Sequence, residues 1–246
     1  IDLRKLGFTL ASAGVFEGVS GKVEIADLVN MKSAPNQQIT LDKVTLGLPI
    51  EKGTIKFQLI GYSAIRLQGA EWPFGGGFIR VKPVDFAFTE GSDNRIVAQA
   101  VNWDLAKLVE QFKLPDVKLV GIVGGDFPVV FRTGSATIDH ATLEATKDGG
   151  VIQYSGSPGD AAAQADANSK MVFDALKDFR YQVLKVGLNG DLAGRMVMSL
   201  SVLGANPKVL GGQPFQLNID IDSELVRLLT STTSQPDIRT AIGQVT

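Results

Sequence analysis

An apolar side chain at every second position marks three segments of the chain, residues 55–59, 65–68 and 215–222. The intervening positions carry Lys, Gln, Arg, Asn or Asp. Because successive side chains of a β-strand point to opposite sides, this period of two predicts strands with one apolar face and one polar face. The pattern therefore favours a sheet that faces water on one side and something apolar on the other.

Residues 120–156 look like three strands separated by turns. Pro128 begins one apolar run, Gly134 ends it, and Gly149 with Gly150 separates the next two. Residues 46–59 echo this arrangement, with a proline, a short run, Gly53 and then a new run. The echo suggests repeated β units that extend one sheet.

Helical spacing is limited to three short segments. Residues 105–112 and 160–178 carry apolar stripes at helical spacing, and residues 223–230 suggest a third, short helix. In residues 39–50 the apolar positions change phase near residues 42–43, which indicates a β-bulge there. The fold class is therefore mainly β with a few helices, the longest of them near residues 160–178.

The chain reads as one elongated β domain over residues 1–246. It holds no linker rich in Pro or Ser and no break in composition, and its weakest join is at residues 157–160. It begins Ile1-Asp2 without a Met and has no apolar run of about 18 residues. We therefore expect a fragment of a longer protein.

Composition narrows the function classes. The 24 basic and 26 acidic residues leave a net charge of −2 with no block of like charge, so nothing indicates a nucleic-acid partner. The absence of Cys excludes disulfides, zinc–thiolate sites and thiol nucleophiles. This cysteine usage is compatible with a cell envelope but does not fix the compartment.

Candidate catalytic and metal-binding residues are few. Residues 75–77, three glycines, lack the helix and the Lys-Ser/Thr pair of a phosphate loop, so a turn is the simpler interpretation. His140 is the single histidine and has no Gly-x-Ser-x-Gly partner motif, which favours an ordinary strand residue. Asp220 and Asp222 lie about 7 Å apart on one strand face, where paired carboxylates can bind calcium or hydrolyse sugars. With Gln216 and Asn218 on the same face, a solvated outer face is the simpler interpretation. We expect no enzyme, no metal and no cofactor.

The apolar strand faces support two interpretations at this point. They either build a filled sandwich or barrel core, or line a groove that holds acyl chains. Periodicity alone does not separate the two, because both need the same side chains on the same face.

Several spaced motifs in the second half resemble one family. They are ALKDFRY at 175–181, MSL at 198–200, GANP at 204–207 and QPFQLNI at 213–219, together with residues 121–154. These motifs resemble the C-terminal domain of the YdbH-like intermembrane phospholipid transport proteins, which are related to the TamB and AsmA-like envelope proteins. The likeness covers about residues 115–230, and its motifs are structural, not catalytic.

The resemblance implies a long, strongly curved antiparallel or mixed sheet with a β-taco-like groove, along which phospholipids move between two membranes. It implies a location in the periplasm of a Gram-negative bacterium and an anchor in the inner membrane. It also implies a small outer-membrane lipoprotein as partner, joined by strand addition. An older name for the domain, dicarboxylate transport, would require converging Arg or Lys residues, and we see no such cluster in the sequence.

Three functions follow for testing. The first is a lipid-binding segment without enzymatic activity, the second a structural or partner-binding β domain with a filled core, and the third a glycan-active enzyme that uses Asp220 and Asp222. For the first, the candidate residues are the apolar members of the alternating segments; some of them must instead pack under the helix at residues 160–178. The candidates are Ile55, Phe57, Leu59, Ile65, Leu67, Phe215, Leu217, Ile219 and Ile221.

Overall fold

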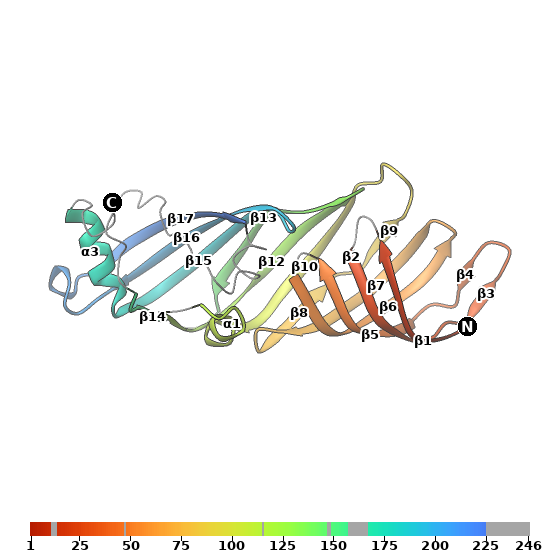
Figure 1. The fold of residues 1–246 in the computed structure, drawn as a ribbon, viewed down its shortest axis with the longest axis horizontal. Coiled ribbons are helices and arrows are strands. Elements are labelled where there is room, and N and C mark those ends of the chain that lie inside the picture. The colour runs from red at the N-terminus through yellow and green to blue at the C-terminus, as the bar shows by residue number, and fades with distance from the viewer. Residues whose placement is uncertain (11–13, 47, 115, 147–148, 157–166, 225–246) are drawn as a thin grey trace.

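The computed structural model describes residues 1–10, 14–46, 48–114, 116–146, 149–156 and 167–224 (Figure 1). Within these residues the chain forms one sheet of 17 strands, together with helices α1 (Leu105–Gln111) and α3 (Ala167–Leu176) and a short 3₁₀ segment η1 (Leu210–Gly212). The strands are β1 (Asp2–Leu10), β2 (Gly14–Lys22), β3 (Ile25–Asp27), β4 (Lys32–Ser33), β5 (Gln37–Leu46), β6 (Leu48–Gly61), β7 (Ala64–Phe74), β8 (Gly77–Val81), β9 (Val84–Ala87), β10 (Asn94–Asp104), β11 (Val117–Val120), β12 (Ile122–Arg132), β13 (Ser135–Ala145), β14 (Gly150–Tyr154), β15 (Phe179–Asp191), β16 (Arg195–Ala205) and β17 (Phe215–Glu224).

Strands join the sheet nearly in chain order. The main path runs β1, β2, β5, β6, β7, β8, β10, β12, β13, β15, β16, β17, and every pairing in it is antiparallel. β9 lies beside β7, the β3–β4 hairpin lies at the end of β6, and β14 joins β11 to β15. Since each new strand adds to the previous one, the molecule is long, with the first strands at one end and β17 near the other (Figure 1). The sheet is antiparallel and not mixed.

The strands predicted in residues 120–156 are present as β12, β13 and β14. The prediction of a repeated β unit in residues 46–59 is wrong. Gly134 lies in the turn before β13, whereas β6 runs without interruption from Leu48 to Gly61 through Gly53. Gly53 serves close packing instead, because a Cβ there would overlap the indole ring of Trp72.

The helix predictions have mixed outcomes. The helix expected at residues 105–112 is α1, and the Asp104 carboxylate accepts a hydrogen bond of 2.9 Å from the Ala106 amide at its start. Of the longer helix expected at 160–178, residues 167–176 are helical and residues 160–166 lie outside the described part. The helix expected from residue 223 is wrong at its start, because Ser223 and Glu224 pair with β16 as part of β17. Residues 225–230 lie outside the described part.

The change of phase near residues 42–43 is real, but no residue is inserted there. The register of β5 with β2 and with β6 is the same before and after Asp42. Instead the neighbouring positions on both strands have left-handed backbones, at Gly18 (φ 68°) and Lys52 (φ 58°). A crease therefore crosses the adjacent strands together, and it turns both Leu41 and Val44 into the interior.

One side of the sheet, the apolar face, carries two clusters of buried side chains. The larger runs from β9 to β17 and includes residues of α3, and the smaller lies on β2, β5 and β7. Phe16, Ile79 and Val81 pack against both clusters. The apolar face is therefore continuous along the described sheet.

The opposite side, the polar face, carries cross-strand ion pairs. Most of these charged residues precede or follow a buried apolar residue in the chain, as Arg66 precedes Leu67 and Glu71 precedes Trp72. These exposed pairs stabilise the fold only weakly, so their main effect is to keep this side of the sheet hydrated. The pairs between directly opposed residues are Lys43–Glu17, Arg66–Asp85, Arg80–Glu71 and Lys185–Glu144.

Candidate functional site

Five of the predicted candidates meet on β6 and β7. Phe57 lies directly opposite Leu67, and Leu59 lies directly opposite Ile65, so their side chains share the apolar face. Phe57 and Leu67 are buried, whereas Leu59, Ile65 and Ile55 are half-buried. The alternation read from residues 55–59 and 65–68 is therefore correct, and its outer members are the accessible ones.

The second set lies on β17. Phe215 and Leu217 are buried, the latter with 3 % of its surface exposed, and Ile219 is half-buried. Ile221 pairs with Met198 on β16, and its side chain lies outside the described part. The intervening Asn218 is exposed on the polar face. The alternation predicted for this strand is correct wherever side chains are described.

The two sets do not touch within one strand pair, because β8, β10, β12, β13, β15 and β16 lie between them in the sheet. They border the same interior, however. Ile65 packs against the large cluster that also contains Phe215 and Leu217. One set therefore lies on the N-terminal half of the apolar face, inside β1, β2 and β5, and the other lies at its β17 end.

Helix α3 accompanies the β17 end of that face. Val172 and Ala175 of α3 belong to the cluster that contains Phe215, and the Phe215 ring meets that of Phe179 edge-on at 5.3 Å. The side-chain amide of Asn206 donates hydrogen bonds of 3.1 and 2.9 Å to the backbone carbonyls of Asp174 and Ala175 at the end of α3. This end of the apolar face is filled by the chain's own side chains.

An aromatic series in the middle of the apolar face was not predicted. Trp103 lies 4.8 Å from Phe74 and 5.2 Å from Phe127, between ring centroids, and Phe86 lies 5.9 Å from Phe131. These rings fill the space between the two candidate sets. Phe86 lies in residues 78–88, where apolar side chains on both faces remove the alternation that identifies a lining strand. The other rings come from separate strands, and the sequence pattern does not record which strands pair.

β1 leaves apolar surface uncovered at the edge of the sheet. Leu6 and Phe8 are exposed, although Phe8 stacks on Phe16 at 5.0 Å. At the end of the strand, Leu10 lines a shallow pocket of about 250 Å³ together with Phe88 and Asn94. A pocket of this size holds a short apolar segment at most.

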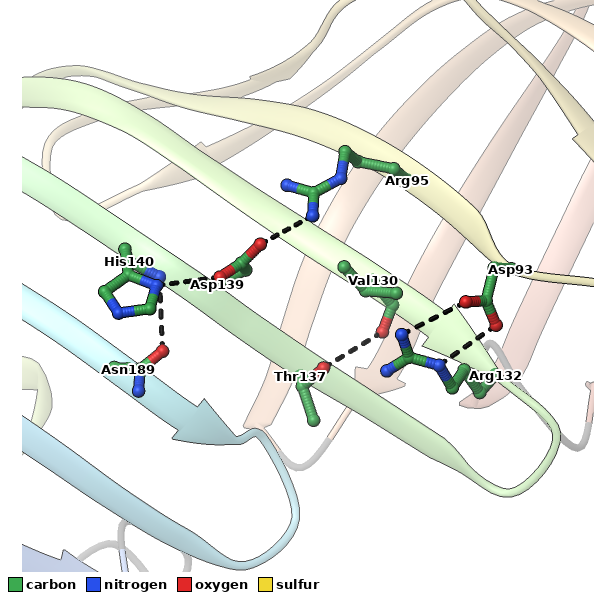
Figure 2. A network of polar contacts seen from close by, with 8 residues as sticks. All are labelled: Asp93, Arg95, Val130, Arg132, Thr137, Asp139, His140 and Asn189. Atoms are coloured by element: carbon green, nitrogen blue, oxygen red, sulfur yellow. Dashed lines mark hydrogen bonds and ion pairs between the residues drawn. The ribbon is translucent and has the colours of Figure 1, made fainter.

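His140 lies on the polar face, in a bulge of β13. Its backbone is left-handed (φ 54°), its amide donates a hydrogen bond of 3.2 Å to the Asn189 side chain, and its ring contacts Asp139 (Figure 2). His140 and then Arg95 lower the pKa of Asp139 by hydrogen bonding. These contacts complete a bulge exposed to water, in agreement with the simpler interpretation of His140.

The remaining catalytic candidates gain no support. Asp220 is exposed on the polar face, and the Asp222 side chain lies outside the described part. In the described ranges, no group of three or more His, Asp or Glu side chains is placed to hold a metal ion. Among the same residues, no helix has the length and apolar character needed to cross a membrane.

A model of the YdbH-like family, described as intermembrane phospholipid transport protein YdbH, matches residues 1–245. The chain belongs to the YdbH-like family. The match extends the likeness from residues 115–230 to nearly the whole sequence, so β1–β10 belong to the same family unit as the motif-bearing strands. The description of the family names phospholipid transport between membranes. No curated protein and no solved structure matches this chain.

Proposed function

We propose that this chain is a periplasmic segment of an intermembrane phospholipid transport protein, which holds acyl chains against the apolar face of its sheet. Membership of the YdbH-like family supports the substrate class. The observation that carries the proposal is the continuity of the apolar face, whose two clusters join at Phe16, Ile79 and Val81, while the other side of the sheet carries ion pairs.

Such a surface suits an acyl chain because binding needs no specific contact. Each methylene group that leaves water gains about 0.8 kcal/mol, so a row of aliphatic side chains retains a chain while permitting movement along it. A charged cluster for the head group is unnecessary if the head group stays in water.

The half-buried candidates are the ones we assign to lipid contact: Ile55, Leu59 and Ile65 on β6 and β7, and Ile219 on β17. Phe57, Leu67, Phe215 and Leu217 are buried on the same face and pack beside the proposed contact. Ile221 stays a candidate by its place on β17.

The test compares two neighbouring residues on opposite faces of β17. Ile219→Asp puts a charge on the apolar face, and Asn218→Asp puts the same charge on the polar face. The purified chain and both variants are extracted, and phospholipid per protein is measured by mass spectrometry. We expect Ile219→Asp to lose most of the lipid and Asn218→Asp to keep it. Equal lipid content in the two variants contradicts the proposal.

A crosslinking experiment places the lipid without a destabilising charge. A photoreactive amino acid at Leu59 or Ile219 should form phospholipid adducts, whereas the same amino acid at Lys56 or Asn218 should not. Adducts at all four positions would indicate general adhesion to lipid and argue against a binding face.

One observation favours a second function, a partner-binding β domain with a filled core. Phe215 and Leu217 are already buried among the chain's own side chains beside α3. In this case the unmodified chain carries no phospholipid after purification, and its edges, β1 and β17, bind a partner by strand addition. A small outer-membrane lipoprotein as that partner, and an inner-membrane anchor elsewhere in the protein, are further parts of the first proposal that need tests of their own.

A further inference from the structure

Three strongly exposed apolar side chains gather at one end of the molecule. Leu28, Val29 and Tyr62 have 73 %, 79 % and 76 % of their surface exposed, the highest values among the exposed large apolar residues of the described chain. Leu28 and Val29 lie in the turn between β3 and β4, and Tyr62 lies in the turn between β6 and β7. We call these three residues the apolar tip.

The two turns are held together. The Tyr62 hydroxyl donates a hydrogen bond of 2.6 Å to the Val29 carbonyl, and Lys32 of β4 pairs with Ile60 of β6. The β3–β4 hairpin projects at the end of the described sheet that carries the first strands (Figure 1). The high exposure of these three side chains on a projecting hairpin makes the apolar tip convex.

Polar groups of Asp27, Asn30 and Tyr62 have hydrogen-bond partners within the two turns. The Asn30 amide donates a hydrogen bond of 3.0 Å to the Asp27 carboxylate, and the Asn30 side chain donates another of 2.6 Å to the same group. With the Tyr62 hydroxyl already bonded to a carbonyl, the tip can leave water without stranding these groups. Asp27 lies opposite Lys32 in the strand pairing at the base of the hairpin. Both residues are charged, so they belong at the level of water and lipid head groups.

We propose that the apolar tip inserts shallowly into the head-group layer of a phospholipid bilayer. A convex group of apolar side chains with satisfied polar groups suits a soft lipid surface better than a flat protein surface. The choice of a bilayer as the occupant rests on the proposed function, because a protein that carries phospholipid between two membranes has to reach a bilayer surface. The charged base of the hairpin limits the depth of insertion.

The test uses the chain's lack of cysteine. Val29→Cys carries an environment-sensitive fluorophore at the tip. Leu210→Cys carries it on η1, where Leu210 is also 50 % exposed but lies between β16 and β17, far from the tip in the chain. With vesicles of phosphatidylethanolamine and phosphatidylglycerol, we expect a blue shift and quenching by brominated acyl chains at position 29 and neither effect at position 210. No change at position 29, or equal changes at both, overturns the proposal.

A second measurement uses unlabelled protein. Leu28→Ser with Val29→Ser should weaken vesicle co-sedimentation about tenfold or more, because two apolar side chains no longer leave water. Leu210→Ser is the matched control and should bind as the unmodified chain does. Raising the salt to about 1 M screens exposed charges. Vesicle binding should stay intact under this condition, because the proposed contact is apolar. Wild-type binding by the double variant, or release by salt, overturns the proposal.

The two proposals can fail separately. The tip variants should keep the phospholipid that co-purifies with the chain, and Ile219→Asp should keep vesicle binding. If vesicles leave the fluorophore at position 29 unchanged while a protein from the same membrane shifts it, the tip is a protein contact and the bilayer proposal is wrong.

Discussion

The phenol hydroxyl of Tyr181 donates a hydrogen bond of 2.9 Å to the backbone carbonyl of Val120, 61 residues earlier in the chain. Tyr181 is almost fully buried, and its hydroxyl lies where a Cβ on Gly121 or Gly150 would stand. The contact fixes β15 against β11, which itself pairs with β14. The missing side chains at Gly121 and Gly150 thus make room for a tyrosine that holds β15 against β11.

We expect Gly150→Ala to destabilise the fold more than Tyr181→Phe. The phenylalanine loses one hydrogen bond, at a cost of about 1 kcal/mol. The alanine methyl group would overlap both the Val120 carbonyl and the Tyr181 ring, so the backbone must move, at a cost of about 1–3 kcal/mol. Urea unfolding of both variants measures the difference. A larger loss in Tyr181→Phe would show that the hydrogen bond and not the close packing holds this joint.

Tyr181 also predicts a loss of stability in alkaline solution. Burial raises the pKa of its hydroxyl, so the unfolded chain releases this proton at a lower pH than the folded chain. The free energy of unfolding should therefore fall as the pH rises above about 10, the ordinary value for tyrosine. Tyr181→Phe should show a smaller fall over the same range. Identical pH profiles for the two proteins would contradict this assignment.

The two tryptophans provide a matched pair. The Trp103 indole N–H donates a hydrogen bond of 3.0 Å to the Phe78 carbonyl, whereas the buried indole N–H of Trp72 has no acceptor among the described residues. Replacement by Phe shrinks the ring at both sites, but only Trp103→Phe loses a hydrogen bond. We expect Trp103→Phe to be less stable than Trp72→Phe by about 1 kcal/mol in thermal or urea unfolding. The reverse order would indicate that the Trp72 N–H finds a partner in solution.

The crease across β2, β5 and β6 depends on Gly18. Its left-handed backbone is unfavourable for Ala, and a Cβ there would overlap the Asp42 side chain. Gly18→Ala should therefore lower the free energy of unfolding by about 1–2 kcal/mol. Gly61→Ala is the control, because a Cβ at Gly61 meets nothing within 4 Å, and it should be neutral or slightly stabilising. Equal effects in denaturant unfolding would mean that the crease can relax.

The ion pair between Arg95 and Asp139 on the polar face should contribute little to stability. The Arg95 guanidinium lies 2.6 Å from the Asp139 carboxylate, but both side chains are exposed (Figure 2). A double-mutant cycle with Arg95→Ala and Asp139→Ala should give a coupling free energy below about 1 kcal/mol that declines further with salt. A larger coupling free energy would show that this ion pair stabilises the bulge of β13.

Sequence alternation was a reliable guide where one face of a strand meets water. Residues 55–59 and 215–219 lie with their apolar members inward and their polar members outward, as predicted. The same reasoning could not rank the candidates. Leu217 and Ile219 follow the same rule on the same strand, yet Leu217 is buried in the larger cluster and Ile219 is half-buried.

The helix prediction from residue 223 failed because local spacing does not record a partner strand. Ser223 and Glu224 extend β17 since β16 offers unpaired backbone groups beside them. The large aromatic cluster was missed for a related reason. Its rings come from β7, β9, β10 and β12, and only the pairing of these strands determines which rings lie inside.

By itself the sequence determined the strands, their two faces and the family, because a period of two in side-chain polarity and short ordered motifs are local properties of the chain. The tertiary structure alone decided the bends at Lys5 and His140, where the left-handed backbone is not marked by a glycine or by a change of phase in the sequence. It also decided which apolar side chains are covered and which reach the surface. Burial is a property of neighbours, and neighbours far apart in the chain become adjacent only when the strands pair.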